Sequence, residues 1–334
     1  MAEYKIKANT QRIPLQDHIP LNTPLRVFLE TSSICNFRCY FCPHGVSSVN
    51  NAMINMIMPF ELAKKCIDDI KLFPQKIKLL TLSTVGEPLL NKKLPEIVAY
   101  AKQSNIADNI DLVTNASLMT HDTADQLIAS GIDRIDISIY GLSKQQYEKN
   151  SSVKINFEEF VNNIRYLYQN KKQCTIVIKI CDAALKEEND EQRFYTFFSD
   201  ICDRISVESI VPIWYGLEYD FQRVDASQNI YGKQRITKNI CPPSFFSLEI
   251  HANGKVSPCC QDWKHLLIIG DAKTESLHQI WTGDKNYHHR ILQLKQGRST
   301  IPACADCQYP ETVVIDNIDP YREMILRRFE ERKI

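Results

Sequence analysis

The stretch ETSSICNFRCYFCPHG (residues 30–45) contains Cys35, Cys39 and Cys42 in the spacing CxxxCxxC. Three thiolates can bind three irons of a four-iron cluster and leave the fourth iron open, much as a catalytic metal site keeps one position free for a substrate. Clusters that only transfer electrons usually have four protein ligands. Three cysteines buried in a core would give the same spacing, so the interpretation depends on the surrounding sequence.

The sequence around the motif supports a catalytic cluster. The motif follows a strand-like run at residues 25–31 and precedes a helical segment that begins with Pro59, and Phe41 stands just before the third cysteine. This arrangement resembles the radical S-adenosylmethionine (radical SAM) superfamily. The resemblance implies that the open iron binds the amino and carboxylate groups of SAM and that Phe41 borders the adenine. It also implies that the reduced cluster cleaves SAM to methionine and a 5′-deoxyadenosyl radical.

Short β-rich runs alternate with helical patterns up to about residue 210, which predicts βα units and a parallel sheet. Six such units predict an α/β fold, a partial (β/α)6 TIM-like barrel whose chemistry lies at the carboxyl ends of the strands. We expect a radical SAM core over residues 1–210 with an N-terminal segment 1–24, a connector 211–240, and a C-terminal unit 241–334 that ends in a helix. The predicted strands cover residues 25–31, 77–84, 110–115, 134–140, 175–180 and 204–210.

Residues after the second predicted strand resemble the element of the superfamily that holds the amino group of SAM. Gly86, Glu87 and Pro88 match its GEP ending, and Val85 replaces the glycine that relatives usually carry. A carboxylate next to an ammonium group forms a charge-assisted hydrogen bond and orients the chelating group. GEP alone is a common turn, but its position after the second strand favours a role in binding SAM.

Three further polar residues lie in later strands. Ser138, in SIYG, resembles the serine of the family's SxDG element, with Tyr140 in place of the aspartate, and this favours a SAM contact. Asn115 ends the third strand, where a strand cap and a SAM contact fit equally well. Lys179 lies among apolar residues of the fifth strand, so it either points outward or needs an anion such as a carboxylate of SAM or of the substrate.

Four later cysteines predict a second cluster. Cys241 and Cys259 flank a predicted β-hairpin with Gly254 at its turn, and Cys304 and Cys307 form a CxxC pair. The pattern resembles a shortened SPASM extension, called a twitch domain. That resemblance implies a single auxiliary [4Fe–4S] cluster on four cysteines, in addition to the [4Fe–4S] cluster that binds SAM. Tetrahedral zinc on four thiolates is the alternative.

The architecture resembles the 2-deoxy-scyllo-inosamine dehydrogenase type of radical SAM enzyme. We therefore expect oxidation of a secondary alcohol of a sugar or aminocyclitol, with the auxiliary cluster as electron acceptor and a flavodoxin or ferredoxin as reductant. A radical epimerase is the alternative, in which Cys260 or Cys181 donates hydrogen to the carbon radical. A peptide maturase is less favoured than an enzyme for small molecules, and a structural zinc or iron–sulfur protein requires several motifs to coincide by accident.

Composition narrows the remaining classes. The chain has 40 basic and 40 acidic residues among 334, and this zero net charge does not suggest a nucleic acid or an anionic membrane as partner. No run approaches the roughly 18 apolar residues of a membrane span, and the N-terminus lacks the apolar core of a signal peptide. We expect a cytoplasmic protein, in which 12 cysteines indicate metal or redox chemistry rather than disulfides. Cys66 lies on the apolar face of a predicted helix and is expected in the core.

Overall fold

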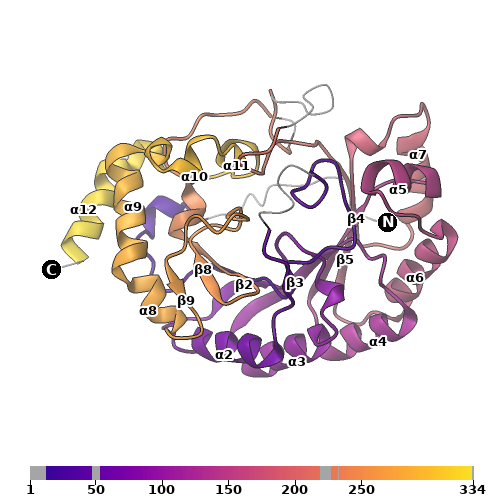
Figure 1. Ribbon diagram of the computed structural model, residues 1–334, viewed down its shortest axis with the longest axis horizontal. Helices are drawn as coiled ribbons and strands as arrows, with labels where there is room; N and C mark the ends of the chain where they lie inside the picture. Colours follow the sequence, from indigo (N-terminus) through magenta and orange to yellow (C-terminus); the bar gives the residue numbers. More distant parts are fainter. Residues whose placement is uncertain (1–12, 47–52, 219–226, 232, 333–334) are drawn as a thin grey trace.

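The structure is a computed structural model that describes residues 13–46, 53–218, 227–231 and 233–332. Nine strands form one sheet in the order β6-β5-β4-β3-β2-β1-β7-β8-β9. The first six strands are parallel, and helices cover the outer side of the curved sheet (Figure 1). This confirms the predicted partial barrel. Its strands are β1 (Arg26–Leu29), β2 (Ile77–Thr81), β3 (Ala107–Thr114), β4 (Arg134–Ile139), β5 (Thr175–Cys181) and β6 (Arg204–Glu208).

Helices follow the first five strands of the barrel. Helix α4 shows how local sequence sets their ends: the Thr120 hydroxyl accepts a hydrogen bond from Thr123 N at its start, and Gly131 has φ of 84° at its end. The sequence pattern does not predict α5, because its polar sequence has a single large apolar side chain, Tyr147, which is fully buried. These helices are α2 (Phe60–Ile70), α3 (Leu94–Ser104), α4 (His121–Ser130), α5 (Lys144–Ser151), α6 (Phe157–Asn170) and α7 (Asp190–Phe198).

The C-terminal unit extends the barrel sheet instead of forming a sheet of its own. β7 (Ser247–Ile250) is parallel to β1 and antiparallel to β8 (Lys255–Ser257), and β9 (Gly270–Asp271) completes the edge. The predicted hairpin is present, and Gly254 at its turn has φ of 87°, a conformation that favours glycine. The remaining helices lie at this end of the sheet (Figure 1): α8 (Leu277–Thr282), α9 (Asp284–Gln296), α10 (Pro302–Ala305), α11 (Tyr309–Thr312) and α12 (Arg322–Arg332).

Side chains alternate between the two faces of the sheet, and this alternation positions the site. Val27 and Leu29 of β1 have no exposed surface and belong to the core shared with the helices. Arg26 and Phe28, on the other face, line a cavity inside the barrel. Cys66 is completely buried in the core, as expected. In the part of the chain that the structure describes, no helix combines the length and hydropathy needed to cross a bilayer.

Candidate active site

The cysteine loop follows β1 and faces the cavity inside the barrel. Cys35, Cys39 and Cys42 line this cavity of about 450 Å³, together with residues at the carboxyl ends of the parallel strands and residues of the C-terminal unit. The Asn36 amide donates a hydrogen bond to Ser117 Oγ at 2.8 Å and thereby ties the loop to the segment after β3. The structure thus places the cysteine triad where the barrel rule puts catalytic residues.

The electrostatics of the three thiols fit a bound iron cluster. Burial raises the pKa of Cys35 to about 11 and that of Cys42 to about 12, and it raises the pKa of Cys39 well above the usual value. The thiolates would also repel one another, so a cationic centre is needed to hold all three deprotonated. The N–H of Phe37 points at Cys35 Sγ, 3.4 Å away, and such hydrogen bonds surround the sulfur ligands of iron–sulfur clusters.

Gly86 has a steric reason to be glycine. A Cβ atom at this position would lie 2.1 Å from the carbonyl oxygen of Ser32, in the segment that leads from β1 to the cysteine loop. The close approach brings the segment after β2 against the cysteine loop, and the Glu87 N–H donates to the carbonyl oxygen of Ile34 at 2.8 Å. Pro88 begins the 3-10 helix η2 (Pro88–Leu90) and is buried, so its contribution is to the shape of this segment.

Glu87 is a buried carboxyl group at the edge of the cavity. Its Oε1 accepts hydrogen bonds from the Thr114 hydroxyl at 2.6 Å and from Leu89 N at 3.0 Å, and its Oε2 accepts from Asn115 N at 2.8 Å. Burial raises its pKa to about 7, and these hydrogen bonds limit the rise. A carboxyl group so placed can pair with the ammonium group of a bound amino acid.

The other predicted SAM contacts all line the same cavity, with different surroundings. Phe41 stacks on Tyr140, with ring centroids 6.1 Å apart and 8° between the planes. Asn115 Oδ1 accepts from Ser117 N at 2.9 Å, so this side chain also shapes a turn. Lys179 has a protein anion as partner, because its Nζ lies 3.6 Å from Glu208. Ser138 lines the cavity as well.

A second, smaller cavity is lined by Cys241, Cys259, Cys304 and Cys307. The hairpin and the CxxC pair therefore bring all four predicted ligands together. Burial and the neighbouring thiols raise the pKa of Cys241 and of Cys259 well above the usual value, and the pKa of Cys304 rises to about 12. The N–H of Gln261 points at Cys259 Sγ, 3.3 Å away. This set also fits a metal cluster that compensates several thiolates.

The sulfur positions favour a cluster over a single zinc ion. Zinc–sulfur bonds of about 2.3 Å place the four sulfurs of a tetrahedral site roughly 3.8 Å apart. Within the described residues, only Glu30, His251 and His265 form a group of three or more potential metal ligands whose ligand atoms all lie within 4.8 Å of one another. The cysteine sulfurs around the second cavity are therefore spread more widely than zinc requires, as suits ligands on separate irons of one cluster.

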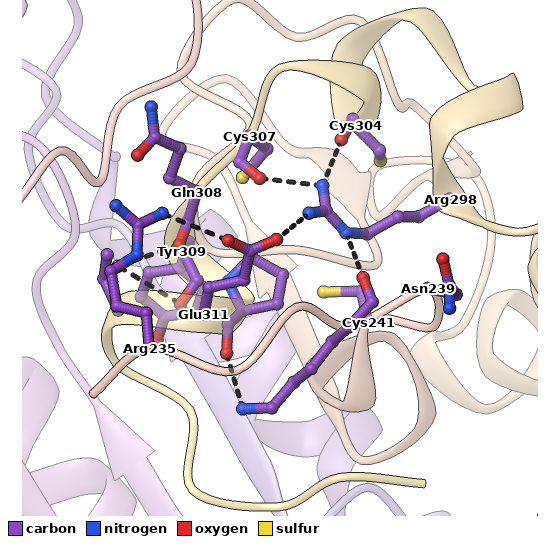
Figure 2. A network of polar contacts seen from close by, with 12 residues as sticks. Arg235, Asn239, Cys241, Arg298, Cys304, Cys307, Gln308, Tyr309 and Glu311 are labelled. Atoms are coloured by element: carbon purple, nitrogen blue, oxygen red, sulfur yellow. Dashed lines mark hydrogen bonds and ion pairs between the residues drawn. The ribbon is translucent and has the colours of Figure 1, made fainter. Parts of the chain in front are cut away.

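Arg298 holds the chain around this second cavity (Figure 2). Its Nη1 donates to the carbonyl oxygens of Cys304 and Cys307 at 2.6 and 2.7 Å. Its Nε donates to the carbonyl oxygen of Lys238 at 2.8 Å, and its Nη2 forms an ion pair with Glu311 at 2.8 Å. The guanidinium also opposes the rise in the pKa of the Cys304 and Cys307 thiols. Sequence spacing alone does not reveal this residue.

Two adjacent cysteines face different cavities. Cys259 lines the four-cysteine cavity, whereas Cys260 lines the barrel cavity that holds the triad. Cys260 Sγ lies 3.8 Å from the hydroxyl of Tyr309 and 3.7 Å from Gln261 Nε2, and burial raises the pKa of this thiol to about 11. Cys181, at the end of β5, lines the same cavity. The two cysteines suspected as hydrogen donors thus share one cavity with the triad.

Sequence reasoning missed several residues of the cavity wall. Arg26 and Glu208 line it from β1 and β6, and strand alternation could have identified both, because they share a face with Phe28 and Lys179. No local pattern marks the aromatic residues that come from the connector and from α11. These are Trp214 and Tyr309.

Two family models match the chain. The model described as the radical SAM superfamily matches residues 29–196, and the SPASM model, described as an iron–sulfur cluster-binding domain, matches residues 241–308. A protein of Metallosphaera sedula named "Probable GTP 3′,8-cyclase" is 27% identical over 205 residues, which cover 61% of this chain and 58% of that protein. A protein of Methanococcus maripaludis with the same name is 33% identical over 115 residues, 34% of this chain and 36% of that protein. The matched region thus covers 58% of the length of the first relative and 36% of the second.

Solved structures share the fold at low sequence identity. The complex of BtrN with AdoMet and 2-DOIA has a TM-score of 0.53 at 18% identity, with 85% of this chain and 92% of that chain covered. Streptococcus suis SuiB bound to S-adenosylmethionine has a TM-score of 0.60 at 15% identity, with 93% and 76% covered. Because the superfamily model spans half of the sequence and the SPASM model follows it, the chain belongs to the radical SAM superfamily and carries a SPASM-type iron–sulfur domain.

Proposed function

We propose that this protein is a radical SAM dehydrogenase that oxidises a secondary alcohol of a sugar or aminocyclitol. The observation that supports this proposal is the pair of cavities joined at Cys259 and Cys260. One cavity, of about 450 Å³, is lined by the cysteine triad, and the other is lined by four cysteines. Four protein ligands leave no iron of the auxiliary cluster free for substrate, so transfer of electrons is the role that remains.

The roles of the residues follow from their positions. Cys35, Cys39 and Cys42 would hold the first cluster, and Glu87 would accept a hydrogen bond from the amino group of SAM, with Phe41 beside the adenine. When bound and reduced, that cluster supplies the electron that cleaves SAM to a 5′-deoxyadenosyl radical. The barrel cavity keeps this radical away from water and orients the substrate.

The barrel cavity is lined mostly by apolar side chains, with a group of polar side chains on its inner wall. Arg26, Thr81, Lys179 and Glu208 line it and offer both donors and acceptors for hydroxyl or amino groups. The radical would take a hydrogen atom from the carbinol carbon. Loss of the hydroxyl proton and transfer of one electron to the auxiliary cluster then leave a ketone, so the alcohol loses two electrons and two protons in all.

The similar proteins support the formation of a radical from SAM more than they support the oxidation of an alcohol. The cyclase name belongs to relatives that this chain matches over 58% of their length or less, so we carry over only the formation of the radical from SAM. BtrN supports the architecture with its 2-DOIA complex, whereas a SuiB structure contains a precursor peptide. We favour a small molecule over a peptide because polar side chains of β1, β2, β5 and β6 lie together on the inner wall of the cavity.

A second candidate function is epimerisation. Cys260 lines the barrel cavity and would donate a hydrogen atom from its thiol to the carbon radical, which returns an alcohol of inverted configuration. The thiyl radical left on Cys260 would then take up one electron from the external reductant and one proton to restore the thiol. The dehydrogenase is preferred because an auxiliary cluster at the cavity wall offers the radical a route to oxidation. Deuterium from heavy water at the reacting carbon, without net oxidation, would identify the epimerase instead.

Anaerobic reconstitution tests the proposal. The protein should hold about eight irons, the sum of two [4Fe–4S] clusters. With dithionite or a flavodoxin system, it should transfer deuterium from carbon-deuterated 2-deoxy-scyllo-inosamine or a related polyol into 5′-deoxyadenosine and release a ketone. Replacing the three triad cysteines by alanine should abolish cleavage of SAM and leave the second cluster. About four irons with one zinc, or cleavage of SAM by the triad variant, would contradict the assignment of the sites.

A further inference from the structure

Three buried residues that the proposed reaction does not yet use lie between the two cavities. Glu30 directly follows β1, Glu249 lies in the neighbouring strand β7, and His251 follows that strand. Their exposed fractions are 2%, 1% and 1%. Two carboxyl groups and an imidazole at such depth are costly to bury unless they are hydrogen-bonded or paired. Such groups are also common at functional sites.

The hydroxyl group of Thr84 connects Glu30 to the barrel cavity. The Thr84 hydroxyl donates to Glu30 Oε1 at 2.8 Å, and Thr84 itself lines the cavity that holds the cysteine triad. The other carboxyl oxygen of Glu30 accepts from Ala252 N at 2.9 Å. A substrate hydroxyl in contact with Thr84 would therefore face a ready-made route for a proton: oxygen to Thr84 Oγ1, and from there to Glu30.

The hydrogen bonds beyond Glu30 fix the tautomer of His251. Ser257 Oγ donates its single proton to Asp262 Oδ2 at 2.7 Å, because Asp262 already accepts from Leu267 N at 2.8 Å and from the Tyr215 hydroxyl at 3.0 Å. Ser257 Oγ must then accept from His251 Nε2, 2.7 Å away. His251 Nδ1 consequently carries no proton in the neutral ring and is free to take one.

Both carboxyl groups face this bare nitrogen. Glu249 Oε1 lies 3.8 Å and Glu30 Oε2 lies 4.0 Å from His251 Nδ1. Glu249 Oε2 is buried without a hydrogen-bond partner. Burial raises the pKa of both carboxyl groups and lowers that of His251. Burial therefore favours the neutral form of all three groups, and Glu30, Glu249 and His251 lie close enough together to share one added proton.

The charged and titratable groups around Glu30 come from three segments. The segment after β2 contributes Thr84 and the backbone of Val85, and β7 and the residues after it contribute Glu249 and His251. The loop after β8 contributes His265, and Asp262 and Cys260 of the same loop act electrostatically on Glu249. Within the described residues, no lysine or arginine forms an ion pair with Glu30 or Glu249. A proton taken up here is thus not opposed by a nearby fixed cation.

We propose that Glu30, reached through the Thr84 hydroxyl, accepts the proton that the substrate hydroxyl releases, and that Glu249 and His251 share it. This inference rests on the proposed dehydrogenase function. The substrate O–H bond breaks, Thr84 passes its own proton to Glu30 and receives that of the substrate, and the electron left on carbon passes to the auxiliary cluster. The product is a ketone, and the electron and proton balance without a further reactant.

The proposed proton acceptor lies close to the four-cysteine cavity, where a nearby proton would stabilise an added electron. Ser257 and Asp262 connect His251 to the four-cysteine cavity, which Asp262 lines. An electron added to a buried cluster costs less when a proton arrives close by, because the interior screens charge poorly. The proton and the electron would thus come to rest close together, the proton at Glu30, Glu249 and His251 and the electron at the auxiliary cluster.

A metal ion at Glu30, His251 and His265 is the alternative use of the same side chains. Their ligand atoms lie within 4.8 Å of one another. However, the two imidazole rings stack, with centroids 3.8 Å apart and 29° between planes. Nitrogen lone pairs lie in the ring planes, so those of stacked rings run side by side instead of converging on one ion.

Two variants separate the proton route from a structural role. Thr84→Val should still cleave SAM and accept deuterium from the carbon-deuterated alcohol, but should form ketone about 100-fold more slowly, the usual effect of losing a positioned proton acceptor. Thr84→Ser, which keeps the hydroxyl, should restore the rate. Formation of ketone by Thr84→Val at the wild-type rate and with the wild-type pH profile would overturn the proposal.

A redox titration tests the proton site without any substrate. In the reconstituted wild type, the midpoint potential of the auxiliary cluster should fall by about 59 mV per pH unit where reduction brings in one proton. Glu30→Gln should flatten this slope, and Thr84→Val should keep it. A flat wild-type slope, or a stoichiometric non-cluster metal that His265→Gln removes, would overturn the inference. An enzyme that oxidises no alcohol but shows the slope would contradict the proposed function alone.

Discussion

At the scale of single residues, the neighbours Cys259 and Cys260 give the sharpest contrast. We expect Cys259→Ala to lose about four irons, because it removes a ligand of the auxiliary cluster. Cys260→Ala should keep all the iron, since its side chain faces the other cavity. Iron analysis and electron paramagnetic resonance of the two variants check this. Loss of iron from Cys260→Ala alone would reverse the assignment of the two side chains.

Glu87 predicts a pH dependence of SAM binding. Its pKa is raised from 4.5 to about 7, so the carboxyl group is neutral below that pH and charged above it. SAM should bind more tightly as pH rises through about 7, because the charged carboxylate is the stronger acceptor for the N–H of the SAM amino group. Calorimetric titration between pH 6 and 8.5 measures this, and Glu87→Gln should bind about 10-fold more weakly at the upper end and lose the dependence.

The same residue affects stability with the opposite sign. Without SAM, the unfolded chain releases the Glu87 proton near pH 4.5, before the folded chain does. The contribution of Glu87 to the free energy of unfolding is therefore full below that pH and is lost as pH rises towards 7. Comparing denaturation of wild type and Glu87→Gln at both ends of this range isolates the effect. A wild-type advantage that grows with pH would contradict the burial argument.

The sequence predicts the roles of some residues of the site and not those of others. Cys35 and Cys304 belong to spacings that predict metal ligands without any other information. Glu30 could be read only as the end of a strand, because its meaning depends on Thr84 and on β7, which lie far away in the sequence. For Lys179 the sequence left two alternatives open, an outward-facing side chain or an anionic partner, and in the structure the side chain pairs with Glu208 on the adjacent strand.

At the scale of elements, the CxxC turn at α10 depends on one arginine. Arg298 donates to the carbonyl oxygens of Cys304, Cys307 and Lys238 (Figure 2). Lysine is a point donor without the planar fork of arginine, so it cannot replace all of these hydrogen bonds. Arg298→Lys should retain the first cluster and lose the second several times faster on exposure to a chelator, as followed by absorbance and iron release.

A matched control for this experiment lies on the surface. Arg165 forms an exposed ion pair with Asp200, far from either cluster in the sequence and on a barrel helix. Arg165→Lys makes the same chemical change and should release iron at the wild-type rate. Equal behaviour of the two variants would mean that Arg298 is not needed to hold the turn.

The sequence predicted most elements because period and turn signals are local. The six barrel strands and the hairpin with Gly254 are present where the patterns place them. The pairing of β7 with β1 could not be predicted, since strand partners are chosen by packing between distant segments. Helix α5 could not be predicted either, because its single buried tyrosine gives no helical pattern of apolar residues.

At the scale of the whole molecule, the continuous sheet predicts cooperative folding. β7 pairs with β1, and Leu248 and Ile250 of β7 belong to the same core as Val27 and Leu29 of β1. A fragment of residues 1–210 would expose an unpaired strand edge and this apolar surface. We expect the fragment to aggregate or to lack a cooperative thermal transition, whereas the full chain melts as one unit by circular dichroism.

Cooperative melting of the fragment would contradict this prediction. A fragment of residues 1–210 that melts cooperatively and binds one cluster would show that the barrel is an independent domain. The predicted boundaries at residues 210 and 241 would then describe folding units, and the β1–β7 pairing would be only a docking contact between them.

The peptide bond between Cys259 and Cys260 has a consequence for how products diverge. In the proposed reaction, a carbon radical in the barrel cavity can give up an electron towards Cys259 or gain a hydrogen atom from Cys260. The product is then decided by a race between two rates, and the branching ratio depends on small shifts of the substrate relative to one short segment of chain. A related protein can therefore change its product through one or two substitutions in the cavity wall, with the barrel and both clusters left intact.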